Sequence, residues 1–362
     1  MQVAPVRPPR VLLTRGLSNV RDALDWLQRE ASPGEFALFA SYATPHTPIR
    51  SVADALLVEP AGSGGEAWLA WLAATAERER IGLIWPQAWI KTLLSHPVAA
   101  KSLAAPIVLP CPDVATYELM HDKAACHAAL VEHYPAIPTA WSTVARGASE
   151  VAAAIAECRD RGCAPCIKPL SGMFGSGFRL LERKGSALRR ILTNDMYTLG
   201  EADLLAAIQA DPHPPPLLVM EYLAGEERSI DVLAWQGAFV AGVVRHKVAE
   251  AAGRWQRVAP DPAAEEIARQ MVVGYQLHGI VNVQTRERIR RDGSREACFL
   301  EVNLRMSGGI GMACAAGLNL PLWLLRLALG TAKISEVPPA PPSGRVAKFE
   351  TAMALGEPAT PW

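Results

Sequence analysis

Two short strands that carry polar residues around an Asp-Gly turn constrain the fold of this chain most strongly. The first strand ends in Val281-Asn282-Val283-Gln284, the second runs Phe299-Leu300-Glu301-Val302-Asn303, and Asp292-Gly293 lies between them. Asp-Gly is a strong signal for a two-residue hairpin turn. We therefore pair Arg291 with Ser294 across the turn. This register places Gln284 opposite Glu301 and Asn282 opposite Asn303.

Side chains alternate between the two faces of such a hairpin. The alternation puts the four polar residues on one face and Val281, Val283, Leu300 and Val302 on the other. A carboxylate and amide carbonyls within roughly 5 Å of one another suit a hard cation such as Mg²⁺. Arg305 follows and can meet a phosphate with its planar set of donors. The pattern predicts a metal–nucleotide site.

Length and charge limit the classes of protein to consider. At 362 residues the chain is too long for one compact core, so we expect two or three domains. Its 36 Lys and Arg residues balance its 36 Asp and Glu residues, which argues against nucleic acid or a membrane surface as a partner. The basic stretch from Arg286 to Arg295 brackets the turn, and we interpret it as a solvated tip.

The sequence shows no sign of export or of a membrane span. The start, MQVAPVRPPR, lacks the apolar core of a signal peptide. No apolar run reaches the length of a bilayer, and the stretch from Leu318 to Leu329 favours a packed helix. We expect a cytoplasmic protein.

The seven cysteines do not indicate a disulfide framework, because they are odd in number and follow no repeated spacing. Cys163-Ala-Pro-Cys166 has the spacing of a redox motif. It leads into an apolar strand instead of a helix, so we interpret both residues as structural. A metal held by cysteines is not expected.

Strands and helices alternate over about the first 112 residues. We expect strands at 11–14, 36–40, 55–58, 82–85 and 106–109, and helices from Ser18, over 66–78 and over 88–96. This alternation predicts a parallel sheet covered by helices. Only Gly16 follows the first strand, whereas a dinucleotide fingerprint needs several glycines. We assign no cofactor to this domain.

A lysine and a glycine-rich loop form the second candidate element. Residues 165–169 predict a buried strand, and Lys168 near its end is costly to bury unless an anion meets it. The alternative is a lysine that extends to the surface. The loop that follows contains Ser171, Gly172, Gly175, Ser176 and Gly177. Its backbone N–H groups can bind phosphate, although it lacks the closing Lys-Ser/Thr of a P-loop.

An interrupted strand follows the proline-rich joint at 211–216. The strand over 217–221 breaks at 223–225 and resumes after Glu227. A broken strand exposes backbone groups that can recognise an adenine edge, and a nearby carboxylate can hold ribose hydroxyls. The alternative is an acid-rich solvated loop.

Together these residues resemble the ATP-grasp superfamily over roughly residues 115–330, and most closely its carbamoyl-phosphate-synthase-like and amino-acid-ligase branches. His121-Asp122-Lys123 is similar to the start of that domain, where a lysine follows an aspartate. The resemblance implies an α/β (α+β ATP-grasp) fold. It implies a parallel α/β pre-ATP-grasp domain over 1–114, a subdomain with the lysines and a lid over 115–215, a subdomain with the metal site over 216–335 and a C-terminal tail over 336–362. The two α+β subdomains would clasp ATP.

The resemblance also implies roles for single residues. Lys123 and Lys168 would contact ATP phosphates beneath a mobile lid formed by residues 171–177. Glu221, Tyr222 and Leu223 would line the adenine, and Glu227 would hold the ribose. Gln284, Glu301 and Asn303 match the Mg²⁺ positions, with Mn²⁺ as the alternative ion. Arg305 matches the arginine that steadies the transferred phosphoryl group.

Two positions depart from the family pattern. Leu304 stands where the family often has a proline. Gln284 replaces an acidic ligand, which leaves open whether one or two metal ions bind.

The resemblance implies an ATP-dependent carboxylate–amine ligase that forms an acylphosphate and then an amide, releasing ADP and phosphate. The alternatives are a non-catalytic ATP sensor and a kinase-like phosphoryl transfer. We expect small-molecule carboxylate and amine substrates and, by family analogy, a homodimer. Candidate acceptor-binding residues lie outside the ATP motifs: Arg245, His246, Lys247, Ser307, Gly308 and Gly309. For His246 the alternative is a hydrogen-bonded structural histidine.

Overall fold

The computed structural model describes residues 7–16, 18–62, 64–170, 177–184, 187–248, 255–349 and 352–353. The chain divides into two compact units. Unit 1 comprises Met1–Glu118, Arg228–Val283 and Val302–Trp362, and unit 2 comprises Leu119–Glu227 and Gln284–Glu301. The domain boundaries expected from the sequence stay a prediction.

A parallel sheet with strand order β3-β2-β1-β4 opens unit 1, which confirms the predicted parallel sheet. Its strands are β1 (Arg10–Leu13), β2 (Ala37–Tyr42), β3 (Ala55–Val58) and β4 (Leu83–Trp85). The accompanying helices are α1 (Asn19–Glu30), η1 (Pro48–Ser51), α2 (Gly65–Arg78), α3 (Ile90–Ser95) and α4 (Pro97–Lys101). The strand expected at 106–109 is reduced to one bridge between Ile84 and Ile107. Helix α3 begins two residues late because Trp89 adopts a left-handed backbone, with φ of 63°.

A second sheet has the strand order β14-β13-β10-β11-β12-β15. Its strands are β10 (Glu227–Trp235), β11 (Ala238–Lys247), β12 (Gln256–Val258), β13 (Gly279–Ile289), β14 (Arg295–Asn303) and β15 (Gly344–Val346). The other elements nearby in sequence are α5 (Val114–His121), α10 (Pro262–Gly274), α11 (Ile310–Ala315), α12 (Leu320–Ala328) and η3 (Ile334–Glu336). The C-terminal segment thus adds β15 to the sheet, antiparallel to β12.

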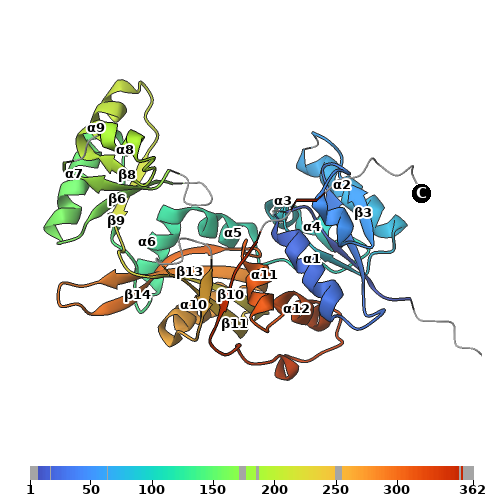
Figure 1. The fold of residues 1–362 in the computed structure, drawn as a ribbon. Coiled ribbons are helices and arrows are strands. Elements are labelled where there is room, and N and C mark those ends of the chain that lie inside the picture. Colours follow the sequence, from blue (N-terminus) through green and yellow to red (C-terminus); the bar gives the residue numbers. More distant parts are fainter. Residues whose placement is uncertain are drawn as a thin grey trace, which may run out of the picture. The chain divides into compact units, whose positions relative to one another are not determined.

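The third sheet, in unit 2, has the order β5-β9-β6-β7-β8. Its strands are β5 (Ser142–Ala145), β6 (Pro165–Pro169), β7 (Arg179–Glu182), β8 (Thr198–Gly200) and β9 (Leu217–Glu221). The helices of this part are α6 (Lys123–His133), α7 (Gly147–Asp160), α8 (Ala187–Leu192) and α9 (Glu201–Ala210). Helices α7 and α9 lie together on this sheet (Figure 1), and their apolar residues Ile155 and Leu204 pack with Ile167 and Val219 of the strands. This core fixes β6, the strand that carries Lys168.

The turn between β13 and β14 differs from the prediction. The Gly293 N–H donates to the Arg290 carbonyl at 2.9 Å, and the Arg290 N–H donates to the Ser294 carbonyl at 2.9 Å. Arg290 therefore faces Ser294, and the loop has three residues instead of two. The expected pairing of Arg291 with Ser294 is wrong by one position. The same offset pairs Arg288 with Glu296, whose side chains meet at 2.6 Å.

All seven cysteines are free thiols, and only Cys163 is partly exposed. Burial raises the pKa of Cys166 to about 12, so its thiol stays protonated. Neither residue of the redox-spaced pair forms a disulfide, in keeping with structural roles.

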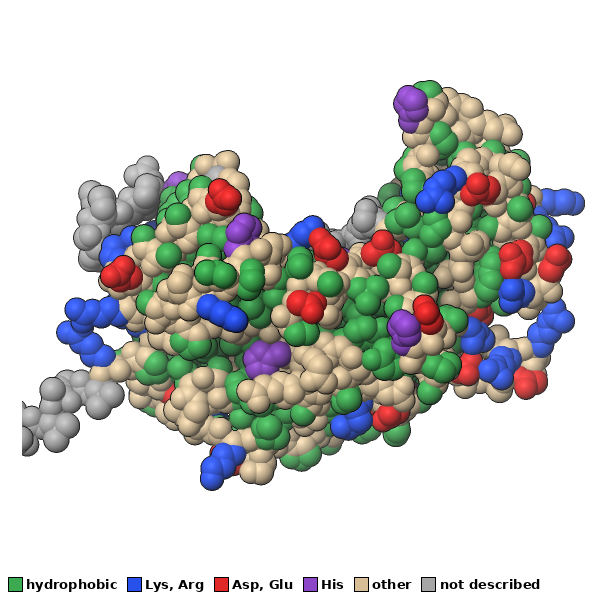
Figure 2. All heavy atoms as spheres, turned by 180° about the vertical axis from the view of Figure 1, so that it is seen from behind, with side chains coloured by type: hydrophobic (Ala, Val, Ile, Leu, Met, Phe, Trp, Pro, Cys, Tyr) green, Lys and Arg blue, Asp and Glu red, His purple; other side chains and the backbone are tan. Residues whose placement is uncertain are grey.

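Charges on the surface are mixed in sign. Figure 2 shows acidic and basic side chains interspersed on the face that it presents. In the part of the chain that is described, no helix is both long enough and apolar enough to span a membrane. The apolar stretch near residue 320 forms the short helix α12, with Leu324 and Leu325 fully buried.

Candidate nucleotide and metal site

Helix α6 begins at the first predicted phosphate-binding lysine. The carboxylate of Asp122 accepts a hydrogen bond from the Ala125 N–H at 2.9 Å and so caps the helix. Lys123 is therefore the first helical residue. The family-like aspartate before this lysine has a clear local function, which is to fix the start of the helix that carries it.

Lys168 shares its electrostatic surroundings with three other predicted site residues, Lys123, Glu227 and Glu301. Burial lowers the pKa of Lys168, and the charge of Lys123 lowers it further. Cys166, Glu301 and Glu227 act in the opposite direction. A positive charge held at a partly desolvated position between acids and a second lysine is suited to a polyanion. Its Nζ also lies 5.9 Å from the centre of the Phe178 ring.

The glycine-rich loop lies almost entirely outside the described residues, which omit 171–176. Gly177, at its end, is described and has a φ of 75°. A Cβ atom there would lie 2.5 Å from Cγ of Pro169. A side chain at this position would thus be strained by both backbone and contact, so the exit of the loop requires glycine.

Glu221 is held by an arginine that the sequence analysis missed. Glu221 is 6% exposed. Its carboxylate accepts hydrogen bonds from Arg288 Nε at 2.7 Å and from Nη2 at 2.8 Å. Arg288 also donates to the Thr139 carbonyl at 2.8 Å, and its hydrogen bonds to Glu221 raise its pKa. The Glu221 carboxylate is thereby engaged within the protein, so any contribution of this residue to an adenine site rests on its backbone.

Arg286 likewise turns back to the broken strand. Its guanidinium lies 5.1 Å from the Tyr222 ring centre and donates to the Tyr222 hydroxyl at 3.2 Å and to the Gly225 carbonyl at 3.2 Å. The prediction that residues 286–295 form a solvated tip is therefore wrong for Arg286. Arg286 and Arg288 are half-buried, whereas Arg290 and Arg295 are exposed. Charge alone could not separate the two pairs.

The three predicted metal ligands occupy half-buried positions. Gln284 stands between buried residues on β13, and Glu301 and Asn303 flank the buried Val302 on β14. One carboxylate and two amide carbonyls are oxygen donors, which suits a hard cation whose remaining ligands come from phosphates and water. The described residues contain no group of three His, Cys, Asp or Glu side chains that would form a metal site by themselves.

Asn282 contacts strand β10, the other neighbour of β13 in the sheet. It is 1% exposed, and its amide donates to Ser229 Oγ at 3.0 Å, to the Ile230 carbonyl at 3.1 Å and to Asp231 Oδ1 at 3.1 Å. Its side chain is thus turned to strand β10. The expectation that it faces Asn303 on β14 stays a prediction.

Arg305 lies near the hydroxyl of Tyr117. Burial raises the pKa of Tyr117, while the charge of Arg305 lowers it. Arg305 is half-buried and is followed by the buried Met306 and Ser307.

Two of the candidate acceptor residues meet in a buried polar cluster. Arg245 is 2% exposed, pairs with Asp231 at 2.9 Å and donates to the hydroxyls of Ser229 and Ser307 at 3.0 Å each. A Cβ on Gly309 would collide with the Arg245 guanidinium, so only glycine leaves room for it. Arg245 thus holds the loop that follows Arg305.

The neighbouring candidates are separate from this cluster. His246 is 3% exposed, with Nε2 at 3.1 Å from the Ala259 carbonyl and Nδ1 at 2.9 Å from Arg257. These bonds agree with the structural alternative for His246. Lys247 and Gly308 are exposed.

His127 is a further residue that sequence reasoning missed. It is 4% exposed, and its Nε2 lies 3.2 Å from the carbonyl of Leu300, the residue before Glu301. Its pKa is lowered by burial and by the charge of Lys168. The neutral ring thus packs behind the strand that carries a predicted metal ligand.

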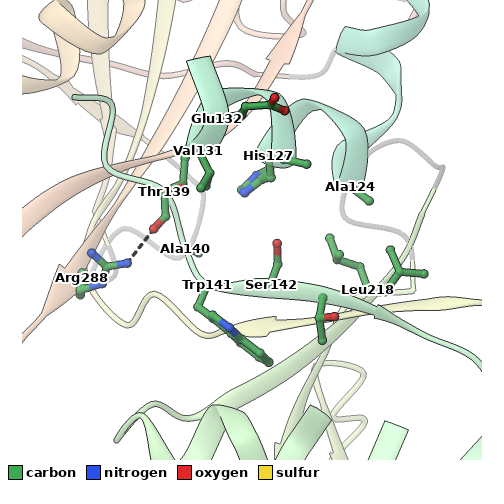
Figure 3. A pocket seen from close by; sticks show the side chains of 13 residues that line it. Ala124, His127, Val131, Glu132, Thr139, Ala140, Trp141, Ser142, Leu218 and Arg288 are labelled. Atoms are coloured by element: carbon green, nitrogen blue, oxygen red, sulfur yellow. Dashed lines mark hydrogen bonds between the residues drawn. The ribbon is translucent and has the colours of Figure 1, made fainter. Parts of the chain in front are cut away.

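A pocket of about 550 Å³ lies beside helix α6 (Figure 3). Its lining includes Ala124 and His127 from the helix and Trp141 and Ser142 from the facing segment. Arg288 borders it and donates to Thr139. Of the predicted ATP and metal residues that the structure describes, none lines this pocket.

Comparison with known proteins identifies the architecture. The profile of a family described as ATP-grasp in the biosynthetic pathway with Ter operon matches residues 213–352. Carboxyaminoimidazole ribonucleotide synthase from Aspergillus clavatus, solved with ATP, is similar with a TM-score of 0.63 at 15% identity, over 94% of this chain and 81% of that one. The chain has an ATP-grasp fold. This result confirms the ATP-grasp fold and the mixed α/β class expected from the sequence.

Other ATP-grasp structures are similar to the same degree. The L-amino acid ligase from Bacillus licheniformis has a TM-score of 0.58 at 14% identity, covering 92% of this chain and 78% of that chain. The biotin carboxylase domain of the 2-oxoglutarate carboxylase from Hydrogenobacter thermophilus, solved with magnesium ADP, has a TM-score of 0.57 at 15% identity, covering 89% and 69%. Among curated proteins, none matches the sequence significantly. At these identities the ATP-grasp likeness concerns the fold alone.

Proposed function

We propose that this protein is an ATP-dependent carboxylate–amine ligase. The observation that carries the proposal is the shared environment of Lys168, Lys123, Glu227 and Glu301, in a chain with an ATP-grasp fold. Two lysines and two carboxylates together suit a nucleoside triphosphate and its counter-ion. In this proposal Lys123 and Lys168 bind the phosphates, Glu227 binds the ribose, and the backbone at 221–223 lines the adenine.

The reaction would proceed in two displacements. An oxygen of the substrate carboxylate attacks the γ-phosphorus, and the bond from that phosphorus to the bridging oxygen breaks, so that ADP leaves with the electron pair. The amine nitrogen then attacks the acyl carbon and loses a proton, and inorganic phosphate leaves. The product is an amide.

The protein's task in the first displacement is to bind and orient charged groups. Lys168 offsets phosphate charge, and Arg305 steadies the transferred phosphoryl group through hydrogen bonds that strengthen in the transition state. When bound, Mg²⁺ would be held by Gln284, Glu301 and Asn303 and would neutralise phosphate charge. Closure of the loop at 171–177 would exclude water from the acylphosphate.

The experiment that tests the function measures ADP release from Mg-ATP with pools of amino acids and small carboxylates. Release that requires both a carboxylate and an amine supports the ligase, and Glu301→Gln serves as the inactive control. Release with a single acceptor indicates a kinase-like transfer instead. Tight Mg-ATP binding without turnover in any pool favours the ATP sensor.

A further inference from the structure

The first turn of helix α1 packs directly against the loop that follows Arg305. Asn19 Nδ2 donates to the Met306 carbonyl at 2.7 Å, and Asn19 is 1% exposed. A Cβ on Gly311 would lie 3.2 Å from Cβ of Asp22, so helices α1 and α11 approach closely. The N-terminal sheet domain therefore supplies side chains to the surroundings of the proposed phosphoryl-binding arginine.

The ammonium group of Lys348 lies where the start of α1 meets the loop after Arg305, a region that we call the junction. Lys348 Nζ lies 2.9 Å from Asp22 Oδ2, 3.5 Å from Ser18 Oγ and 3.5 Å from the Gly308 carbonyl oxygen. A carboxylate, a hydroxyl and a carbonyl can each accept one of the three N–H bonds of a primary ammonium. Ser18 is the N-cap residue of α1, Asp22 lies in the first turn of that helix, and Gly308 follows Arg305 by three residues.

A second acceptor nearby lacks a donor. Asn19 Oδ1 is buried and has no hydrogen-bond partner among the described residues. A buried amide oxygen without a donor is costly, so such an atom commonly marks a place where a ligand or an ordered water donates. The described residues of the junction therefore leave at least one buried acceptor without a donor.

The contact of Lys348 is easily exchanged. The Lys348 and Asp22 side chains are 39% and 20% exposed, and an exposed ion pair contributes little stability. Lys348 follows β15 by two residues, so the strand holds the lysine near the junction without burying it. A free ammonium compound can compete with such an occupant.

We propose that Ser18, Asp22 and the Gly308 carbonyl form the subsite for the primary ammonium group of the amine co-substrate, and that Lys348 fills it when the amine is absent. This inference rests on the proposed ligase function, because it identifies where that reaction's amine binds. The recognised class is a primary aliphatic amine, since a quaternary ammonium offers no N–H to the three acceptors.

The first test measures binding of n-butylammonium, which has the end group of a lysine side chain, by NMR titration without ATP. Lys348→Met should increase its affinity about two- to fivefold, the range expected for loss of an exposed ion pair. Asp22→Asn should weaken binding in the Lys348→Met background. The matched control is Lys333→Met, an exposed lysine in the same C-terminal segment, which should leave the affinity unchanged.

Two results would overturn the subsite. One is equal affinity for n-butylammonium in the wild type and Lys348→Met. The other is equal affinity of Lys348→Met for n-butylammonium and for butyltrimethylammonium, which has the charge without the N–H donors. Both binding measurements are independent of turnover. If ADP release needs no amine, that result rejects the ligase function but not the ammonium-binding subsite. In an active ligase, Lys348→Met should lower KM for the amine while KM for ATP stays constant.

Discussion

Arg288 binds both carboxylate oxygens of Glu221, with hydrogen bonds of 2.7 and 2.8 Å, although the two residues are 67 positions apart in the sequence. The pair joins the turn end of the β13–β14 hairpin to the end of β9. Since Glu221 is the residue at which the interrupted strand begins its break, this ion pair fixes the geometry of the segment proposed to line the adenine.

We expect Arg288→Met to destabilise unit 2 by roughly 1–3 kcal/mol, because the buried Glu221 carboxylate loses both arginine donors and keeps only the Trp141 N–H at 3.3 Å. The thermal midpoint of unfolding measures the effect. The double variant Glu221→Gln/Arg288→Met should recover part of the loss, since the uncompensated charge is then removed. Additive losses in the two single variants would show that the residues do not act as a pair.

Lys168→Met should strongly weaken ATP binding, because the proposed phosphate contact is lost. In the absence of ATP the same change should raise the thermal midpoint at neutral pH. Burial lowers the pKa of Lys168 in the folded state, so keeping it protonated costs stability below that pKa, and the cost disappears as pH rises toward the usual value of 10.5. The exposed Lys184→Met is the control for both measurements. Unchanged ATP affinity would contradict the phosphate role.

Glu301→Gln should abolish magnesium-dependent turnover and leave the circular dichroism spectrum unaltered. The substitution keeps the shape of the side chain but removes the single carboxylate of the proposed ligand set. Asp160→Asn, an exposed acid on helix α7, controls for a general change of charge. Full activity of Glu301→Gln across a magnesium titration would reject the metal assignment.

Arg305→Lys should lower kcat by at least tenfold and change ATP affinity much less. A lysine keeps the charge but loses the planar pair of donors that the transferred phosphoryl group requires in the transition state. Steady-state kinetics and equilibrium ATP binding separate the two effects. Equal losses in kcat and affinity would reduce Arg305 to a ground-state binder.

His127 should make the protein sensitive to acid. Burial lowers its pKa below the usual 6.5, so the unfolded chain binds the proton more readily and stability falls as pH decreases below about 6.5. His127→Gln should reduce the slope of the free energy of unfolding against pH. Denaturant unfolding between neutral and mildly acidic pH measures it, and an identical slope in both proteins would exclude the histidine as its source.

The parts of the site that the sequence predicts are those marked by a polar residue inside an apolar strand. Lys168 and Glu301 stand out in this way, since burying either charge requires a reason that is visible in the local sequence. The parallel sheet of the N-terminal part similarly follows from alternating strands and helices. Local pattern is sufficient in both cases.

The parts that the sequence does not predict depend on contacts between distant segments. The basic stretch at 286–295 looks uniform in sequence, yet two of its arginines meet Glu221 and Tyr222 and others remain in solvent. Arg245 is a candidate for substrate binding in the sequence because it lies outside the ATP motifs. Its partner Asp231 comes from the neighbouring strand, fourteen positions away.

The distribution of the cysteines has a practical consequence. Six thiols are buried and Cys163 alone is partly exposed, two residues before the start of β6, the strand that carries Lys168. A maleimide fluorophore should therefore attach at one position in the native protein. Because Ala164, the next residue, accepts the backbone hydrogen bond of Tyr222 at 2.8 Å, the dye would sit beside the segment proposed to receive the adenine ring. The wild-type sequence thus carries its own attachment point for a nucleotide-binding reporter.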